Sequence, residues 1–436
     1  MALGGGTWVT QNKVLPGAYI NFVSAARASA SLSDRGIATI PVALDWGALG
    51  EVIEVTTADL QRHSTALFGY DFTAPQLKDI RDLFKNTRLG YIYRLGSGGV
   101  KASNEFATAL YEGARGNDLK VVIASSVDVP DSFDVTLYLG TTLVDAQTVV
   151  TAEGLVDNAF VKWVDGATLT PTAGMSLSGG ESPAITNADY QAYIDKIEGY
   201  SFNVIGCPTD DTGVKSLFAA FTKRMRDEQG VKFQCAMYNP EGKSDFEGVV
   251  DILNDVEGDE AYSLVYWVTG VLAGTNVNQS AMNRVYNGEY TIKVPHTQTQ
   301  LENAIRGGKF AFHRVGNSDV RVLADINSLT TFTVNKNEDF AQNQTIRVID
   351  QIANDIAYLF NSKYLGTVPN DADGRISLWA DIVSHHNQLQ TIRAIEDFTG
   401  EDVTVEQGES KRAVLVNDAI TVVNAMEKLY MTVTIS

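Results

Sequence analysis

Two segments of the 436-residue sequence combine residue types that could do chemistry. The first is LGSGGVKAS, residues 95–103, which follows an apolar run of strand-like composition and therefore invites comparison with a phosphate-binding loop. Such a loop needs a glycine directly before its lysine, because the backbone amides must approach the phosphate closely. Here Val100 precedes Lys101. The spacing therefore predicts an ordinary loop between two elements.

The second segment contains Cys207, which stands where a predicted strand meets the loop before a predicted helix. Asp210 and Asp211 are close enough to cap that helix. A catalytic thiolate would need a histidine partner, and no histidine occurs at a specific spacing from Cys207. Cys207 and Cys235 both lie in apolar, strand-like runs. This context predicts two buried free thiols in preference to a disulfide.

The histidines show no metal-binding pattern. His385 and His386 are adjacent on a predicted helix, where neighbouring side chains point about 100° apart and suit a shared metal poorly. The other three, His63, His296 and His313, are isolated. We expect a solvated or locally hydrogen-bonded imidazole at each position. Without a hydrolase, zinc-protease or calcium-loop signature, the sequence predicts no catalytic residue, no metal and no cofactor.

The charge balance excludes two classes of partner. The chain has 34 basic and 53 acidic residues, giving a formal net charge of −19. Phosphate backbones and anionic lipid headgroups would repel such a surface, so we expect no direct binding to nucleic acid or membranes. The first residues lack a basic segment followed by an apolar one, and we expect a protein made in the cytoplasm without a secretion signal.

The periodicity of apolar residues predicts the elements around these candidates. Before residue 119 we expect strand-like runs and one helix, 73–85, and from there to about residue 180 we expect short β-rich runs separated by turns. From residue 187 strands alternate with helices, and Asn187 is the expected N-cap of the first of these helices. Amphipathic helices are predicted at 345–364 and at 376–395. The fold class is therefore an α/β and α+β multidomain core with an inserted all-β module and extended strand arms at both ends. The expected division is an N-terminal arm at 1–25, an α/β core at 26–118 with 181–327, a β-sandwich-like insertion at 119–180, a C-terminal domain at 328–428 and a C-terminal arm at 429–436.

The two terminal segments have strand patterns: AYINFVS comes after a polar, glycine-containing leader, and the closing strand has no turn after it. In the closing segment LYMTVTIS, apolar and polar residues alternate strictly. Backbone donors and acceptors of a strand need partners, so each segment must join a sheet. One interpretation places both strands in the sheet of their own subunit. The other is strand exchange, in which each terminus extends a sheet of a neighbouring copy.

Several segments resemble one protein family in their order and spacing. They are LPGAYINFVSAA, LYEGARGNDLKVVI, LSGGESPAITNADYQAYIDKIEGYSFNVIGCP, VLADINSLTTFT, TIRVIDQIANDIAYLFNSKYLGTVPNDADGRISLWADIV and AMEKLYMTVTIS. Together they cover most of the chain. They resemble the contractile tail sheath proteins of myophages and R-type bacteriocins, most closely those of phages and phage-derived particles from Gram-positive bacteria.

This resemblance implies a structural subunit that polymerises helically around an inner tail tube and contracts by rigid-body rearrangement, driving the tube through a bacterial envelope. It implies three kinds of protein partner: neighbouring sheath subunits, the inner tube protein, and baseplate and tail terminator proteins. Its location would be the tail of a virion or phage-tail-like particle assembled in the host cytoplasm. The terminal strands would pair with neighbouring subunits, and the resemblance assigns this role to Tyr19, Ile20, Phe22, Val23, Leu429, Met431, Val433 and Ile435.

The resemblance also implies that the C-terminal domain faces the tube. The helix at 376–395 and the preceding loop, 371–375, are the candidate surface, with Arg375 and Arg393 as its charged residues. The same helix could instead only pack the domain core through Ile376, Trp379, Ile382 and Val383. Two other functions remain open: a cytoplasmic α/β enzyme with a β insertion and a thiol at Cys207, and another phage tail component such as an inner tube or baseplate protein.

Overall fold

The computed structural model describes residues 32–316 and 319–435. This part of the chain forms two compact units. The main unit contains residues 33–354, 392–396 and 422–435, and the C-terminal unit contains residues 355–391 and 397–421 together with Leu32. None of the described helices is long and apolar enough to cross a membrane.

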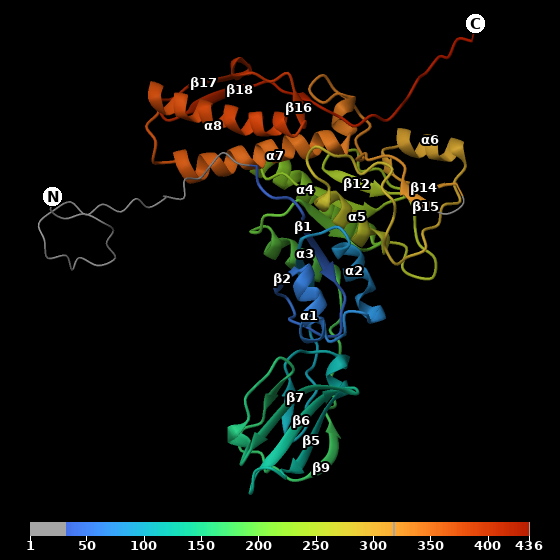
Figure 1. Ribbon diagram of the computed structural model, residues 1–436, viewed down its shortest axis with the longest axis vertical. Helices are drawn as coiled ribbons and strands as arrows, with labels where there is room; N and C mark the ends of the chain where they lie inside the picture. Colours follow the sequence, from blue (N-terminus) through green and yellow to red (C-terminus); the bar gives the residue numbers. More distant parts are fainter. Residues whose placement is uncertain (1–31, 317–318, 436) are drawn as a thin grey trace, which may run out of the picture. The chain divides into compact units, whose positions relative to one another are not determined.

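A seven-stranded sheet forms the centre of the main unit, in the order β13-β12-β11-β10-β1-β3-β2. Figure 1 labels β1, β2 and β12 of this sheet. All neighbouring pairs are parallel except β2 and β3, which are antiparallel. Helices cover both faces, so the central strands are apolar on both sides, as in VIGC of β10. The strands of this sheet are β1 (Ile37–Val42), β2 (Val52–Thr56), β3 (Leu89–Arg94), β10 (Val204–Cys207), β11 (Gln234–Tyr238), β12 (Val249–Ile252) and β13 (Lys309–Phe310).

Two apolar cores lie on the two faces of this sheet. Alternate residues of one strand divide between them: Val204 joins the core with α1, α2 and α5, whereas Ile205 joins the core with α3 and α4. Helix α5 is buried along nearly its whole length, and a Cβ at its Gly274 would lie 1.8 Å from the carbonyl oxygen of Asn86. The helices of the main unit are α1 (Thr57–Phe68), α2 (Lys78–Phe84), α3 (Asn187–Ile197), α4 (Thr212–Arg224), α5 (Leu264–Gly274) and α6 (Gln298–Arg306).

Side-chain caps fix where these helices begin. The carboxylate of Asp59 accepts hydrogen bonds from the backbone and hydroxyl of Thr56, forming a capping box at α1. Asp211 caps α4 through the amide of Val214, as the sequence predicted. At α3 the prediction was wrong by one residue, because the capping box is formed by Thr186 and Asp189 and Asn187 is already helical.

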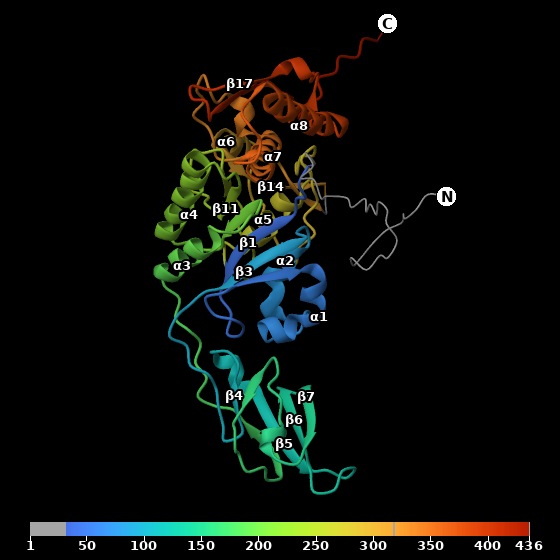
Figure 2. The same ribbon diagram turned by 90° about the vertical axis from the view of Figure 1, so that its left-hand side faces the viewer.

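The β-rich segment forms a module with its own core. One sheet has the order β7-β6-β5-β9, and a second contains only β4 and β8 (Figure 2). A turn at Gly140 joins β6 to β7. The core between the sheets extends from Ala102 and Phe106 to Leu177, and it also includes Trp46. The strands are β4 (Ala107–Ala109), β5 (Leu119–Ser125), β6 (Phe133–Leu139), β7 (Thr142–Val149), β8 (Val161–Trp163) and β9 (Thr172–Ser176).

Helix α7 (Asn343–Leu359) begins in the main unit and ends in the C-terminal unit. The C-terminal unit also contains α8 (Ala372–Thr391) and a ribbon of two antiparallel strands, β17 (Val403–Gln407) and β18 (Val414–Asp418). Both long helices agree with the predicted helices to within a few residues at each end. The remaining short strands are β14 (Phe312–Val315), β15 (Asp319–Val322), β16 (Ile395–Glu396) and β19 (Thr421–Val422), of which β14 and β15 form an antiparallel pair.

Candidate assembly surface

The two cysteines are buried and free, as predicted, in the neighbouring strands β10 and β11. Burial in the apolar core raises the pKa of both Cys207 and Cys235 well above the ordinary value of a thiol. Because the thiolate is the reactive form, this environment suppresses nucleophilic chemistry.

The glycine-containing segment around Lys101 is an irregular connection into the β module, as predicted. Isolated bridges join Ser97 to Ala184 and Val100 to Glu181, so the outgoing and returning chains run together. Nζ of Lys101 lies 3.8 Å from Oε1 of Glu112. In the described residues, no group of three or more His, Cys, Asp or Glu side chains is placed to hold a metal ion.

The β17–β18 ribbon is a two-stranded antiparallel sheet in the C-terminal unit. Each strand has the other as its only strand partner among the described residues. The register pairs Val405 with Val416 and Val403 with Asp418, so these four side chains share one face of the ribbon. Trp379 of α8 donates from its indole nitrogen to the carbonyl oxygen of Val403, and the Val403 side chain is 3% exposed, so this face lies toward α8. The ribbon therefore packs with one face and keeps an edge without a strand partner.

An apolar hollow lies beside the inner face of β18. It measures about 460 Å³. Val416 is 37% exposed, so the hollow leaves part of the ribbon's apolar face uncovered. The lining residues are Ile356, Ala357, Phe360, Asn361, Leu378, Ile382, Val414 and Val416. A strand added along β18 could place every second side chain in this hollow.

The closing segment has no partner of its own in the described structure. Its last described hydrogen bond joins the amide of Ala425 to Gln344, and none is found for residues 426–435. The four apolar side chains of the predicted arm are 69–92% exposed: Leu429, Met431, Val433 and Ile435. The segment is not a strand in the isolated subunit, and Figure 1 draws it without an arrow. Its pairing with a neighbour stays a prediction, and Tyr19, Ile20, Phe22 and Val23 lie outside the described residues.

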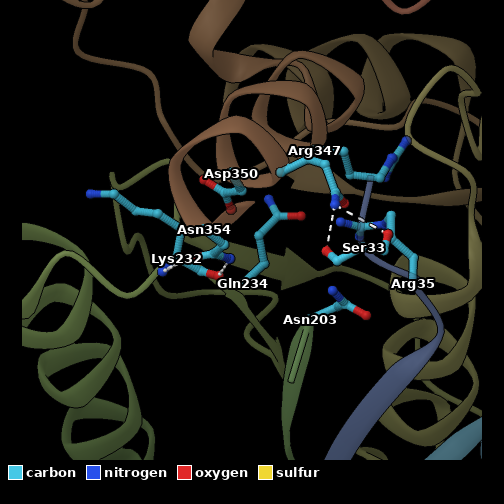
Figure 3. A pocket seen from close by; sticks show the side chains of 9 residues that line it. Ser33, Arg35, Asn203, Lys232, Gln234, Arg347, Asp350 and Asn354 are labelled. Atoms are coloured by element: carbon cyan, nitrogen blue, oxygen red, sulfur yellow. Dashed lines mark hydrogen bonds between the residues drawn. The ribbon is translucent and has the colours of Figure 1, made fainter. Parts of the chain in front are cut away.

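A small polar pocket lies where α7 meets the segment before β1 and the strand β11 (Figure 3). Burial, followed by repulsion from Arg226, lowers the pKa of Lys232 in this pocket. The backbone amide of Lys232 donates to Oδ1 of Asn354 at 3.0 Å, and Nδ2 of Asn354 donates to the carbonyl oxygen of Lys232 at 2.8 Å. The pocket is lined by Ser33, Arg35, Asn203, Lys232, Gln234, Arg347, Asp350, Gln351 and Asn354. Its size suits a water molecule rather than a substrate.

Two buried ion pairs hold the first half of α7 in the main unit. Arg226 donates two hydrogen bonds to the carboxylate of Asp350, at 2.6 Å and 2.8 Å, and both side chains are less than 10% exposed. Arg347 pairs with Asp325, and both are 1% exposed. Breaking a buried pair leaves an uncompensated charge, which costs several kcal/mol. These pairs therefore make the start of α7 a rigid part of the main unit.

The two arginines of the expected tube-facing surface differ in their position relative to α8. Arg375 is half-buried in the first turn of α8, where it donates to the backbone and side-chain oxygens of Asn370 at 3.1 Å. Helix α8 ends at Thr391, so Arg393 lies beyond the helix, in a turn with φ of 61°. Ile376 is 61% exposed and does not pack the core. The buried apolar residues of α8 are Leu378, Ile382 and Leu389, and Trp379 and Val383 are half-buried.

Comparisons with known proteins agree along nearly all of the described chain. Four family models match in order: "Tail sheath protein Gp18 domain III N-terminal region" at 35–95, "Phage tail sheath protein beta-sandwich domain" at 97–182, "Phage tail sheath protein central domain" at 183–328 and "Phage tail sheath C-terminal domain" at 335–436. The phage-like element PBSX protein XkdK of Bacillus subtilis is 33% identical over 473 residues, covering 100% of both chains. The chain belongs to the phage tail sheath family.

Solved structures of sheath proteins have the same fold. The sheath tail protein of Desulfitobacterium hafniense is similar with a TM-score of 0.82 and 35% identity, covering 95% of this chain and 99% of that one. The sheath tail protein of Listeria innocua gives a TM-score of 0.79 and 29% identity, with coverage of 92% and 94%. The helical sheath of the anti-feeding prophage in its contracted state shares the fold at 14% identity and a TM-score of 0.61.

This sheath protein is therefore a structural component of a contractile tail or tail-like particle, and not an enzyme. The alternative of an α/β enzyme using Cys207 is wrong. Sequence reasoning also missed the hollow beside β18 and the interaction between His385 and His386. The strand-like pattern at 414–418 was the only available signal for the hollow. Nothing in the sequence indicated that the two imidazoles would meet.

Proposed function

We propose that this sheath subunit polymerises helically through exchanged terminal strands around an inner tail tube, and that the polymer contracts when its subunits repack as rigid bodies. The observation that carries the proposal is the pairing of two incomplete elements in one chain. One is the closing segment, with apolar side chains on one face and no hydrogen-bond partner. The other is β18, with an unpartnered edge beside an apolar hollow.

The closing segment of one copy suits the β18 edge of another in length and pattern. Residues 429–435 are enough for a strand opposite the five residues of β18. An added strand would gain main-chain hydrogen bonds along the edge. Its alternate side chains, such as Met431 and Val433, would enter the hollow beside Val416. We propose that the N-terminal residues Tyr19, Ile20, Phe22 and Val23 act in the same way.

Rigid-body movement requires that each subunit resist deformation. The buried pair of Arg226 and Asp350 and that of Arg347 and Asp325 support this requirement, because they fix α7 to the main unit. Interfaces between subunits, which depend on exposed contacts worth about 0–1 kcal/mol each, would change before these buried pairs do. The continuous arms would keep neighbouring subunits connected during the change.

The proposal extends to the placement of the remaining domains. We propose that the inserted β module, 119–180, faces outward and that the C-terminal domain, 328–428, faces the tube, with Arg375 and Arg393 at that surface. The arms would be residues 1–25 and 429–436. The further partners would be the inner tube protein, the baseplate and the tail terminator, and the particle would assemble in the host cytoplasm without direct contact with nucleic acid or membrane.

Electron microscopy of the purified full-length protein tests this function. We expect hollow helical cylinders, either alone or after addition of the inner tube protein. A variant with Val433 changed to proline should remain a folded monomer, because proline removes a ladder donor only where the strand is paired. A matched Thr432→Val variant, which keeps the amide, should still form cylinders. Cylinders formed equally well by the proline variant would overturn strand exchange at this end.

A further inference from the structure

Two buried side chains of α7 hold the chain just before the closing segment. Oε1 of Gln344 accepts from the backbone amide of Ala425 at 3.0 Å, and its Nε2 donates to the carbonyl oxygen of Val423 at 3.0 Å. The hydroxyl of Thr345 lies 3.2 Å from both Oδ1 and Nδ2 of Asn424. Gln344 and Thr345 are 5% and 4% exposed. One turn of a helix therefore holds residues 423–425 through their main chain and through a side chain.

The turn of α7 that makes these contacts is itself fastened to the central sheet. Asn343 is fully buried, and its Nδ2 donates to Oδ1 of Asp325 at 3.0 Å. Its Oδ1 accepts from Nε2 of Gln234 in β11 at 2.8 Å. Arg347, one turn further along, pairs with the same aspartate. Releasing such buried polar groups leaves them unpaired at a large cost, so these contacts make a stiff base.

The contacts stop at Ala425. Met426 is fully exposed, and in the described structure no hydrogen bond holds residues 426–435. The predicted arm begins at Leu429, so residues 426–428 form a link of three residues between the held segment and the arm. An extended chain spans at most about 3.6 Å per residue, which limits this link to about 11 Å.

We propose that Gln344 and Thr345 are positioning residues that clamp the root of the C-terminal arm and thereby select the neighbour that receives it. This inference rests on the proposed function, in which the arm joins a sheet of another copy. A clamped root lets the arm pivot only beyond Ala425, so the arm reaches only an acceptor edge within about 11 Å of that point. If the clamp opened, residues 423–425 would join the link and its reach would double to about 22 Å.

The short link has two consequences for assembly. An acceptor edge that the link cannot span has an effective concentration near zero, so more distant copies are excluded as partners. A root already held at Ala425 also has less conformational freedom to lose when the arm binds. Both effects favour one regular arrangement of subunits over a mixture of polymers.

Hydrogen exchange of the unassembled full-length protein tests the clamp itself. We expect the amide of Ala425 to be protected, and Gln344→Met or Thr345→Val to raise its exchange rate by about tenfold, as for one lost hydrogen bond. Thr345→Ser keeps the hydroxyl and should leave the rate unchanged, as should Gln191→Met at an exposed position of α3. Peptides from α5 serve as the internal reference. An unprotected amide in the unaltered protein, or equal exchange in the valine and serine variants, would overturn the clamp.

Spin labels measure whether the clamp fixes the direction of the arm. One label is attached at Met426→Cys and the other at Gln191→Cys, while Cys207 and Cys235 are buried and stay unlabelled. We expect a narrow distribution of distances, which Thr345→Val broadens and Thr345→Ser does not. A merely structural role would leave both widths unchanged. Equal widths in the two variants would overturn the positioning role.

Electron microscopy then tests the selection of neighbours. Thr345→Ser should form ordered cylinders, whereas Thr345→Val should form polymers without a single helical order, because its arms reach more than one neighbour. Ordered cylinders of Thr345→Val, together with a broadened distance distribution, would overturn neighbour selection. A failure of the unaltered protein to form cylinders would overturn the proposed function, and the exchange and distance measurements on the monomer would still decide the clamp.

Discussion

Removal of the closing segment should separate folding from assembly. A truncation ending at Lys428 deletes four apolar side chains that are 69–92% exposed in the isolated subunit. Because little of their surface is buried there, the free energy of unfolding of the monomer should change by less than about 0.5 kcal/mol. In a polymer, full burial of each side chain would contribute about 1.5–3 kcal/mol before ordering costs are subtracted.

The assay compares the truncated and full-length proteins in two measurements. Urea denaturation at low concentration reports the stability of the monomer, and electron microscopy with sedimentation reports cylinders. We expect coincident denaturation curves and a complete loss of cylinders. A truncated protein that assembles normally would refute strand exchange at this end. A truncated protein that is molten or insoluble would instead show that the segment belongs to the fold of its own subunit.

Three further changes test other parts of the argument. Arg226→Met should destabilise the main unit by about 3–5 kcal/mol in urea denaturation, because it leaves the buried carboxylate of Asp350 without its partner. The control Arg224→Met breaks an exposed pair with Glu198 and should cost at most about 1 kcal/mol. Equal effects of the two changes would refute the larger contribution of the buried pair. Burial raises the pKa of Asp79 to about 6 from the ordinary 3.8, so the native carboxyl holds its proton to higher pH and stability falls as pH rises between these values. Asp79→Asn, whose side-chain oxygen can still accept from Tyr290, should therefore stabilise the protein by about 1–2 kcal/mol at pH 7.5 and hardly at all at pH 4. Because the side chain is only partly buried, solvent keeps this gain below the value of the full pKa shift. An equal gain at both pH values would show that burial of the carboxylate is not its cause. Charge reversal at Arg393, alone and with Arg375, should weaken co-sedimentation of sheath with tube and spare sheath polymers, whereas unchanged tube binding would remove these residues from the tube-facing surface.

Local signals in the sequence predicted most of the elements. The cap at Asp211 and the buried, apolar setting of Cys207 and Cys235 in β10 and β11 depend on residues close together in the chain, and both predictions were confirmed. The α3 cap was missed because Thr186 and Asp189 form a reciprocal pair that outcompetes Asn187. The end of α8 was placed too late because the apolar pattern continues through Ile395, although the chain turns at Arg393.

The class of this sheath protein could be assigned without its structure, because family resemblance, negative charge and the lack of catalytic spacing are properties of the order and composition of its residues. Tertiary structure decided the features that depend on distant residues. The hollow beside β18 requires α7, α8 and the ribbon to converge, and Arg226 meets Asp350 across 124 positions of the chain. The contact between His385 and His386 depends on rotamers, and these are set by Asp355 and Asp418 on two other elements. A pattern of neighbouring residues contains no information on such partners, because the energy that selects them arises only when the elements pack.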